Sequence, residues 1–399
     1  MLVGAHVAAK DPFAGAERIG ADVIQLHLSS PRMWRDPVGR DDAQELCEAS
    51  IVASAHAPYL CNPASGDPAV RERTARSLAV TLAEAERCGV KGVVVHAGHA
   101  AGGGSMDDAI ERWIDVARTL RSSVPLLIEN TASGTTAPGR HLADVSRLFA
   151  ALRAEDLDVT IGSCFDTCHA WAGDPDCATD PAGYLKAFAE ATGGIDLLHV
   201  NDSKDEAGAG RDRHENLGAG RIGLDALEAM VVTAAELGTS AAIVETPGDD
   251  ETHAADIRTV RRFLATFSPP MITESTRADI EAGSQSYFVR GSVVVDPGYA
   301  GIYTYARSAD EEIPALQEGQ ELALDGEPWI VDKETQPPSR ISQAKLIEMM
   351  EERGLGTKAT RADIIQKLFD RGYVYGNPPV PTETGIALYE AFKNYVPAM

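Results

Sequence analysis

The stretch AVRERTARSLAVTLAEAERCGVKGVVVHAG, residues 69–98, contains the repeating unit on which the fold prediction depends. Its first part is apolar at intervals of about 3.6 residues and ends at a glycine, which predicts an amphipathic helix. Its last part, GVVVHAG (92–98), is a short β-rich run that predicts a strand. Seven similar runs occur before about residue 268: LVGAHVA (2–8), VIQLHL (23–28), IVASAHA (51–57), LLIENT (126–131), VTIGSCFD (159–166), LLHVND (197–202) and AIVET (242–246).

Strand-like runs and helical patterns alternate along this part of the chain. Eight such units in about 265 residues predict an α/β fold, the (β/α)8 TIM barrel, because both the size and the number of units match. An open doubly wound sheet is the alternative, and it would place a glycine-rich phosphate-binding loop after the first strand. The segment GAHVAAKDPFAG (4–15) is a poor candidate for that loop, so the barrel is favoured.

The alternation ends around TFSPPMITES (266–275). Three strand-like segments follow, STRADIEAG, YFVRGSVVVDPG and AGIYTYARS, and then a helical tail. Because 399 residues exceed what one core usually holds, we expect two domains. The predicted domains are the barrel at 1–268 and a smaller α+β domain at 272–399, strand-rich over 272–330 and helical, with a winged-helix-like tail, over 340–399.

The composition is strongly acidic, with a formal net charge of −24 and only 9 lysines beside 27 arginines. This balance suggests a halophilic source, because a high charge of one sign keeps proteins soluble in salt, or else a high-GC genome. DNA-binding proteins normally present a basic face, so any DNA binding by this chain must depend on local sites.

The sequence also predicts a soluble, cytoplasmic protein without membrane contact. Its apolar runs are shorter than the roughly 20 residues of a membrane span, and its start lacks the basic and apolar parts of a signal peptide. Its six cysteines show no CxxC spacing, so disulfides are not expected. Cys164 and Cys168 are expected to be buried small residues rather than ligands.

Histidine, aspartate or glutamate occupies seven of the eight β-rich runs or their ends. The C-terminal ends of barrel strands form the mouth of the active site, so these side chains are expected to meet in one small volume. A single histidine at a strand end is more often structural than a ligand, but several buried carboxylates and imidazoles on one rim favour a metal cluster. The residues are His6, His56, His96, Glu129, Asp166, His199 and Glu245, and the remaining run contains His27.

Nitrogen and oxygen donors without thiolates suit Zn²⁺ at a catalytic site, with Mn²⁺ or Fe²⁺ as substitutes. One ion takes three or four protein ligands, so this number of donors implies more than one ion. His169, together with Asp212 and His214 of the loop GRDRHENLG, forms a further possible triplet. Clusters of two or three divalent ions most often hydrolyse phosphate esters, which makes a phosphodiester or phosphomonoester the expected substrate.

In these motifs the sequence resembles the endonuclease IV family of apurinic/apyrimidinic endonucleases, from residue 1 to about 265. The shared motifs are GAHV, SPRMW, HAPYL, VVHAG, IENTA, FDTCHAW, LHVNDSK, DRHENLGAGRIG and IVET. DTCHA, NDSK and the DRH block are the most specific of them. The resemblance implies three zinc ions, and all nine expected ligands are present. The first ion would be held by His56, His96 and Glu129, the second by Glu129, Asp166, His199 and Glu245, and the third by His169, Asp212 and His214.

The resemblance also implies an activity on double-stranded DNA with abasic sites. We expect the protein to be a monomer. A hydroxide would attack the phosphorus 5′ of the abasic nucleotide, and the products would be a 3′-hydroxyl and a 5′-deoxyribose phosphate. Glu245 would orient or deprotonate the attacking water. Arg32, Tyr59 and Leu60 would enter the DNA stack while the abasic nucleotide is flipped out, which costs little where a base is missing. The catalytic carboxylates would be Glu245, Glu129 and Asp166.

Residues 272–399 resemble a fragment of an archaeal-type type IA DNA topoisomerase. The stretches that carry this resemblance are PPSRISQAKLIEMMEERGLGTKATRADIIQKLFDRGYV and PTETGIALYEAF. They predict a helix, a glycine turn, a second helix and a short wing, as in DNA-binding helical modules. Thr360 and Asp363 predict a capped start of the second helix, and Lys358 with Arg361 predicts a phosphate-binding site there.

Strand passage by this C-terminal part is not expected. The sequence lacks the clustered acids of a Toprim domain, and Tyr305 lies where the nucleophile of the topoisomerase family does not fall. The expected role is accessory DNA binding, or the segment is a relic of gene fusion.

Two other functions remain open for the barrel. Sugar isomerases and epimerases share the fold and bind one or two metals through similar strand ends. The DRH loop argues against that class, because a third ion has no role in proton transfer at a sugar. A DNA-binding protein built on an inactive barrel is the second alternative, and the presence of every expected ligand argues against it.

Overall fold

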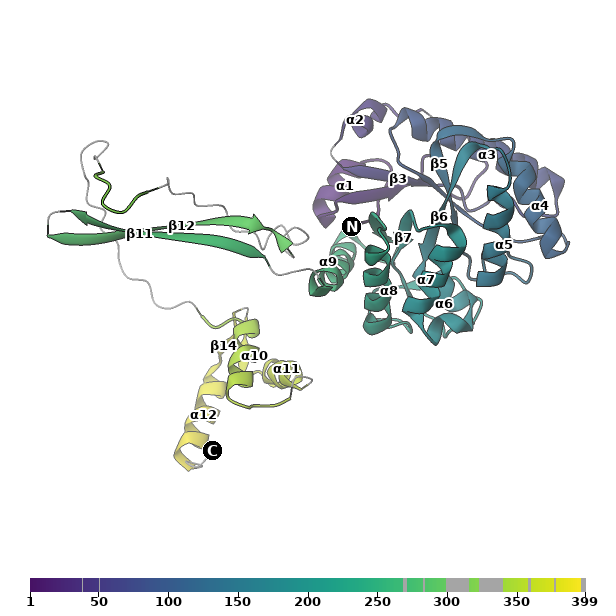
Figure 1. Cartoon of the computed structure of the whole chain (residues 1–399). Coiled ribbons are helices and arrows are strands. Elements are labelled where there is room, and N and C mark those ends of the chain that lie inside the picture. Colours follow the sequence, from purple (N-terminus) through teal and green to yellow (C-terminus); the bar gives the residue numbers. More distant parts are fainter. Residues whose placement is uncertain are drawn as a thin grey trace. The chain divides into compact units, whose positions relative to one another are not determined.

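The computed structural model describes residues 1–37, 39–49, 51–267, 271–282, 284–298, 316–322, 340–357, 360–376 and 378–395. Eight parallel strands close into a barrel in the order β1-β10-β7-β6-β5-β4-β3-β2, with helices around it (Figure 1). The strands are β1 (Leu2–His6), β2 (Val23–Leu26), β3 (Val52–His56), β4 (Val93–His96), β5 (Arg121–Glu129), β6 (Asp158–Asp166), β7 (Leu197–His199) and β10 (Ala241–Val244). Each overlaps one of the eight β-rich runs, so the predicted barrel is confirmed.

The connections between the strands contain the helices. Their starts follow from local chemistry: Pro68 lacks an N–H group that the first turn would leave unpaired, and Asp67 Oδ1 accepts a hydrogen bond from Ala69 N at 2.9 Å. The helices are α1 (Pro12–Ile19), α2 (Ala43–Glu48), α3 (Pro68–Arg87), α4 (Met106–Ala117), α5 (Leu142–Arg153), α6 (Thr167–Gly173), α7 (Pro181–Thr192), α8 (Leu224–Glu236) and α9 (Asp250–Phe267), with a 3-10 turn at Pro175–Ala178. A short antiparallel ladder joins β8 (Asp202–Ser203) to β9 (His214–Glu215).

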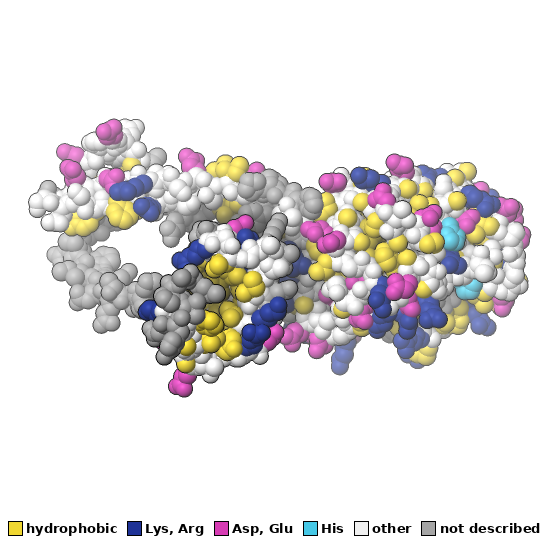
Figure 2. Space-filling model, turned by 90° about the horizontal axis from the view of Figure 1, so that it is seen from below, with side chains coloured by type: hydrophobic (Ala, Val, Ile, Leu, Met, Phe, Trp, Pro, Cys, Tyr) yellow, Lys and Arg dark blue, Asp and Glu magenta, His cyan; other side chains and the backbone are white. Residues whose placement is uncertain are grey.

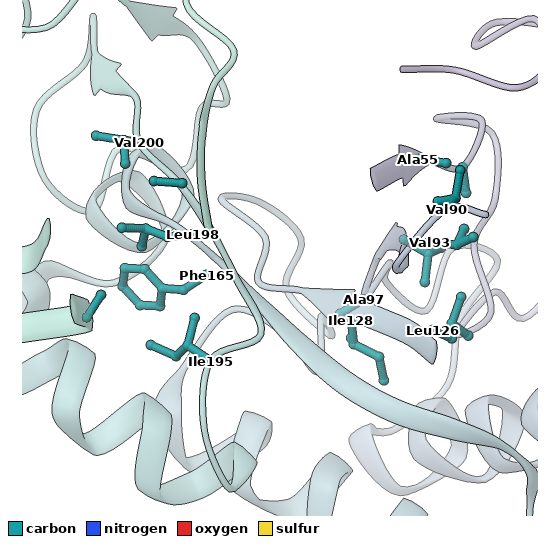
Figure 3. Close-up of a cluster of buried hydrophobic side chains, with 14 of the residues drawn as sticks. Ala55, Val90, Val93, Ala97, Leu126, Ile128, Phe165, Ile195, Leu198 and Val200 are labelled. Carbon is teal, nitrogen blue, oxygen red and sulfur yellow. The ribbon is translucent and has the colours of Figure 1, made fainter. Parts of the chain in front are cut away.

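The barrel strands bury both of their faces, in two separate hydrophobic clusters. The larger one lies between the sheet and the helices, and Figure 3 shows part of it, including Val93, Leu126 and Phe165. The smaller one takes the alternate residues, which fill the barrel interior: Val23, Val94, Leu127, Cys164, Leu197, Ala241 and Ile243. Side chains two residues beyond the interior cluster therefore point into the barrel at its C-terminal mouth.

Trp113 of α4 tests how much the helix–sheet cluster contributes to stability. Its side chain is fully buried and its Nε1 donates a hydrogen bond to the Ala97 carbonyl at 2.7 Å. We expect Trp113→Ala to lower the free energy of unfolding by about 3–5 kcal/mol, because it leaves a large cavity. Urea denaturation followed by circular dichroism measures this. Trp34→Ala, at a partly exposed tryptophan, is the control, and equal losses in the two variants would contradict the prediction.

The C-terminal region begins with a long antiparallel hairpin, β11 (Ile272–Ala282) and β12 (Gln285–Asp296), at the place of two predicted strands. The third predicted strand, AGIYTYARS with Tyr305, lies outside the described residues. The tail contains α10 (Gln343–Glu352), α11 (Arg361–Asp370), the paired β13 (Val374–Tyr375) and β14 (Val380–Pro381), and α12 (Glu383–Tyr395). This is the predicted order of helix, glycine turn, helix and wing.

The chain divides into two compact units, Met1–Leu316 and Gln317–Met399, a division later in the chain than the boundary expected near 268–275.

Hydrophobic and basic side chains lie together on the surface of the second unit (Figure 2). Tyr389 and Phe392 of α12 are more than half exposed, and Lys393 Nζ lies 5.8 Å from the centroid of the Tyr389 ring. Among the described helices, none has the length and apolar character needed to cross a membrane.

Candidate metal centre

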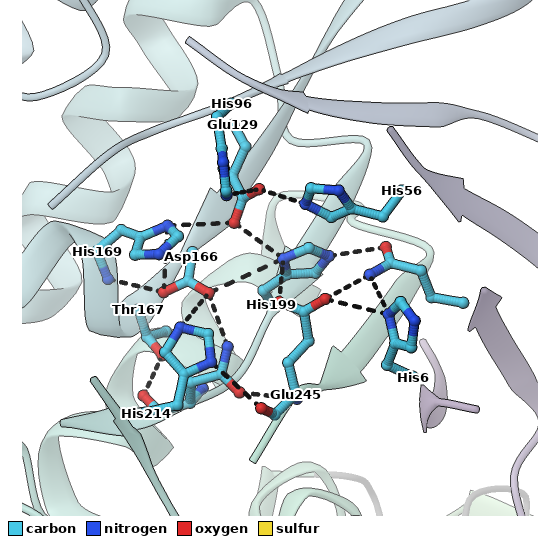
Figure 4. A network of polar contacts seen from close by, with 12 residues as sticks. His6, His56, His96, Glu129, Asp166, Thr167, His169, His199, His214 and Glu245 are labelled. Atoms are coloured by element: carbon cyan, nitrogen blue, oxygen red, sulfur yellow. Dashed lines mark hydrogen bonds and ion pairs between the residues drawn. The ribbon is translucent and has the colours of Figure 1, made fainter. Parts of the chain in front are cut away.

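Six side chains meet at the barrel mouth, and they come from the ends of six strands that are neighbours in the barrel. Each lies two residues after an interior position of its strand, so the alternation of the strands turns it inward. Neighbouring strands bring two pairs level with each other, His96 beside Glu129 and Asp166 beside His199. Figure 4 shows these side chains pointing toward one another. The six residues are His56, His96, Glu129, Asp166, His199 and Glu245.

Glu129 lies at the centre of the cluster and is completely buried. Its Oε2 lies 3.2 Å from His56 Nε2 and 3.3 Å from His96 Nε2. His56 Nδ1 lies 2.7 Å from the Ala57 carbonyl oxygen, so Nδ1 carries the proton and Nε2 presents its lone pair to the site. Three donor atoms therefore converge on one point, as the binding of an ion requires.

The donor atoms just described form a first group, and Glu129 also belongs to a second group. His199 Nδ1 lies 3.1 Å from Glu129 Oε1, 3.3 Å from Glu245 Oε2 and 3.8 Å from Asp166 Oδ2. Burial would raise the pKa of Glu129, but His96 and His199 outweigh it and hold that pKa well below its ordinary value. Glu129 is therefore a carboxylate at neutral pH, and its two oxygens face two different sets of donors.

A third group lies beside them. Asp212 Oδ1 lies 3.1 Å from His169 Nε2 and 3.2 Å from His214 Nε2. His169 reaches the site from α6, whose first turn is capped by Asp166: Oδ1 of that carboxylate accepts a hydrogen bond from His169 N at 2.7 Å. In FDTCHAW, the spacing of Asp166 and His169 thus places one side chain in the second group and the other in the third.

The donors fit divalent cations by their chemistry and by their burial. In each of the three groups the donor atoms lie within 4.8 Å of one another, and all are nitrogen or carboxylate oxygen. Glu129 and Asp166 are fully buried, and buried carboxylates of this kind are stabilised by cations. Within the described part of the chain, the buried Nε2 of His214 makes no well-aligned hydrogen bond, although Asp212 Oδ1 lies 3.2 Å away. This nitrogen and the carboxylate are both available as donors of the third group.

A fourth group, Asp166, Cys168 and His214, also brings its donor atoms within 4.8 Å of one another and was not predicted. Burial raises the pKa of the Cys168 thiol to about 12, so the thiol stays protonated and is a poor ligand. Cys164 is likewise buried, and burial raises its pKa to about 12. All six cysteines are free in this structure.

The three residues expected to enter DNA lie on loops beside the cluster. Arg32 is exposed after β2, and Tyr59 and Leu60, 50% and 38% exposed, follow β3. A backbone hydrogen bond from Tyr59 N to the Pro31 carbonyl, 3.0 Å long, joins the two loops. A groove of about 390 Å³ continues from Tyr59 and Leu60 to the metal centre, where His96, His169 and Asp212 also line it.

Three buried amides support the cluster, and the sequence analysis did not identify them. Asn201 Nδ2 donates to Asp166 Oδ2 at 2.7 Å, and its Oδ1 accepts from Glu245 N at 2.8 Å. Asn130 accepts from Asp166 N at 2.7 Å, and Gln25 reaches both His199 and Glu245. Asn130 and Asn201 stand beside ligands in IENTA and HVNDSK, so an inspection of ligand neighbours could have found them.

The predicted phosphate site at α11 does not have the expected form. Lys358 lies outside the described residues. Thr360 makes no side-chain cap to α11; its Oγ1 instead accepts a hydrogen bond from Thr357 N at 2.8 Å. Arg361 is buried, its Nε donates to the Leu355 carbonyl at 3.2 Å and its Nη1 lies 3.4 Å from Glu351. Thr360 therefore does not cap α11 as predicted, and the side chain of Asp363 lies outside the described residues. The contact of Lys358 and Arg361 with DNA stays a prediction.

Comparisons with known proteins agree with this geometry. A family model described as "Xylose isomerase-like TIM barrel" matches residues 13–267, and one described as "DNA topoisomerase" matches 240–399. "Probable endonuclease 4" of Mycobacterium tuberculosis is 44% identical over 234 residues, 59% of this chain and 90% of that protein. The protein of the same name from Mycobacterium leprae is 42% identical, with the same shares.

Solved structures of known proteins are also similar to this chain. Endonuclease IV from Thermus thermophilus is 30% identical with a TM-score of 0.57, and the match covers 67% of this chain and all of that chain. A D-tagatose 3-epimerase-like protein, 18% identical with a TM-score of 0.52, covers 67% of this chain and 98% of its own, and it shows the fold alone. The chain therefore belongs to the endonuclease IV family of nucleases, and it has a C-terminal segment similar to DNA topoisomerase.

Proposed function

We propose that the barrel is a zinc-dependent endonuclease that hydrolyses the phosphodiester 5′ of abasic sites in double-stranded DNA. Its products would be a 3′-hydroxyl and a 5′-deoxyribose phosphate. The observation that supports this most strongly is the meeting of three donor groups at one mouth, with Glu129 common to two of them. The family relationship supports the same reaction class.

Three Zn²⁺ ions would occupy the three groups, with Mn²⁺ or Fe²⁺ as substitutes. When bound, such ions lower the pKa of water and neutralise charge on the phosphate in the transition state. The proposed ligands are His56, His96 and Glu129 for the first ion, Glu129, Asp166, His199 and Glu245 for the second, and His169, Asp212 and His214 for the third.

The carboxylates of the second group differ in their exposure, and this difference supports different roles. Glu129 and Asp166 have no exposed side-chain surface, whereas the Glu245 side chain is 14% exposed. Burial would raise the pKa of Glu245, but His199 and His6 hold it well below its ordinary value, so this carboxylate is a weak base that still accepts hydrogen bonds. We assign Glu245 to orienting the attacking water, and Glu129 and Asp166 to holding charge beside it.

The experiment that tests the function uses a duplex with one tetrahydrofuran abasic analogue, which cannot undergo β-elimination. We expect a single cut 5′ of the analogue, with a 3′-hydroxyl that a DNA polymerase extends directly. The same duplex with an intact base should remain uncut. A cut on the 3′ side, or none by zinc-loaded protein, would contradict the proposal and would leave sugar phosphates as the substrates to test.

Tyr59 is proposed to fill the space left by the flipped-out nucleotide, together with Leu60 and Arg32. Its ring is half exposed, and its hydroxyl lies 3.3 Å from His27 Nε2, which holds the ring beside the groove. Stacking of an aromatic ring on a base is worth about 1–3 kcal/mol, so we expect Tyr59→Ala to lower kcat/KM by roughly 5- to 150-fold. Tyr59→Phe, which keeps the ring, is the matched control. If both variants lose activity equally, the hydroxyl rather than stacking is responsible.

The C-terminal segment is proposed to bind DNA as an accessory, without strand passage. The match to DNA topoisomerase supports this, and Lys358 and Arg361 remain the proposed contacts, although Arg361 Nε donates to the Leu355 carbonyl. Photocrosslinking of duplex DNA to the full chain, with crosslinked peptides mapped by mass spectrometry, tests the proposal. Crosslinks confined to barrel peptides would contradict it.

A further inference from the structure

Gln25 is a buried polar residue in the middle of an apolar strand. It belongs to β2, where all four residues are buried, and its side chain has no exposed surface. Strand alternation places it two residues after the interior residue Val23, level with His6 of β1 and Ser54 of β3. A primary amide at such a place is costly unless its hydrogen bonds are made, so its partners show what holds it there.

Both ends of this amide are bonded to the second donor group. Gln25 Nε2 donates to Glu245 Oε1 at 2.6 Å and lies 3.2 Å from His6 Nδ1. Gln25 Oε1 lies 2.9 Å from His199 Nε2. The reverse orientation of the amide would place its oxygen against the Glu245 carboxylate, where two acceptors would repel each other. The contacts therefore define which end of the amide faces which ligand.

The amide oxygen decides the tautomer of His199. An oxygen of this kind can only accept a hydrogen bond, so His199 Nε2 must carry the proton. His199 Nδ1 then presents a lone pair, and this is the atom within 3.3 Å of both Glu129 Oε1 and Glu245 Oε2. The opposite tautomer would direct an N–H bond at these carboxylates, and its Nδ1 could not bind a cation.

The amide nitrogen of Gln25 fixes the orientation of the Glu245 carboxylate. By holding Oε1 it fixes the rotation of the carboxylate, and Oε2 then faces His199 Nδ1. One side chain thus orients two ligands that lie 174 and 220 residues away in the sequence. Partners of this kind raise metal affinity because the ligands need no reorganisation when the ion binds.

We propose that Gln25 is a positioning residue, which sets the His199 tautomer and the Glu245 rotation so that both ligands face the second ion. This inference rests on the proposed metal site but not on the proposed substrate. His6, 3.4 Å from Glu245 Oε1, contacts the same carboxylate oxygen and leaves Oε2 to face His199.

Gln25→Met tests the proposal, because methionine keeps the length and approximate volume of the side chain without its hydrogen bonds. The metal-free chain is titrated with Zn²⁺ against a chromophoric chelator, and the dissociation constant of each ion is compared with that of the wild type. We expect one ion to bind about 10- to 100-fold more weakly and the others within a few-fold of the wild type. Ser54→Ala is the matched control, at a buried interior residue level with Gln25 whose hydroxyl donates to the Ile24 carbonyl.

The unfolding midpoint of each metal-free variant shows whether the barrel is intact, and Gln25→Leu replaces Gln25→Met where methionine does not fold. Wild-type affinity for every ion in a folded variant would overturn the proposal, as would equal weakening in Ser54→Ala. If the wild-type chain binds zinc but does not cut abasic DNA, the proposed function is refuted. The zinc titration of the Gln25 variants then still decides whether Gln25 positions the two ligands. A wild-type chain that binds no zinc would overturn both.

Discussion

Glu129→Gln is expected to reduce incision at an abasic analogue by on the order of 10³-fold or more, and added zinc should not restore it. The reason is that both oxygens of Glu129 are in use. Oε2 lies within 3.3 Å of His56 and His96, and Oε1 lies 3.1 Å from His199 and 3.2 Å from His169. An amide removes the charge common to the first two groups and turns an N–H₂ group toward two of the imidazoles.

The measurement combines single-turnover incision with metal analysis after dialysis against buffered zinc. Wild-type protein stripped by a chelator should lose incision and regain it with zinc, whereas Glu129→Gln should neither regain incision nor hold the first two ions. Glu190→Gln, at an exposed carboxylate of α7, is the matched control and should behave as wild type. A Glu129→Gln variant with full zinc content and incision within about 10-fold of the wild type would contradict this account of the site.

The sequence was sufficient for the barrel because its strands are short apolar runs that stand out between amphipathic helices. It was also sufficient to select the residues that meet at the mouth, since histidines and carboxylates at the ends of such runs are conspicuous. Their division into groups came from the family resemblance, and the distances around Glu129 and Asp212 now agree with it. Occupancy by ions stays a prediction.

The amides could not be selected in the same way, for a physical reason. Gln25 has no distinctive chemistry, and its importance arises only when barrel closure places β2 near Glu245 and His199. Arg361 is the opposite case, a residue expected at an open phosphate site that is bonded within its own segment. A basic residue at a helix start looks like a phosphate contact, but the turn before α11 offers the Leu355 carbonyl, and the guanidinium bonds to it. Both outcomes depend on backbone positions that local sequence patterns do not reveal.

Asp212 provides the second large expected effect, and it separates a three-ion site from a two-ion site. It is the most exposed carboxylate of the cluster, with 48% of its side chain accessible, and it lies on a loop rather than on a barrel strand. Burial would raise its pKa, but His169 and His214 hold that pKa well below its ordinary value. The carboxylate is therefore charged at neutral pH, and its replacement should disturb the third group without disturbing the core.

We expect Asp212→Asn to lose one zinc ion of three, to keep its circular dichroism spectrum and to incise abasic duplex roughly 10²-fold more slowly, the usual cost of removing one electrostatic stabiliser. Glu206→Gln, at an exposed carboxylate of the preceding segment, is the matched control. If Asp212→Asn lost one ion but retained full incision, two ions would be enough for the reaction. The DRH loop would then no longer distinguish this site from the one- or two-metal sites of sugar epimerases. If the ion and the incision rate are lost together, the third group belongs to the hydrolytic centre, because a site that only moves protons on a sugar has no phosphate charge for that ion to neutralise.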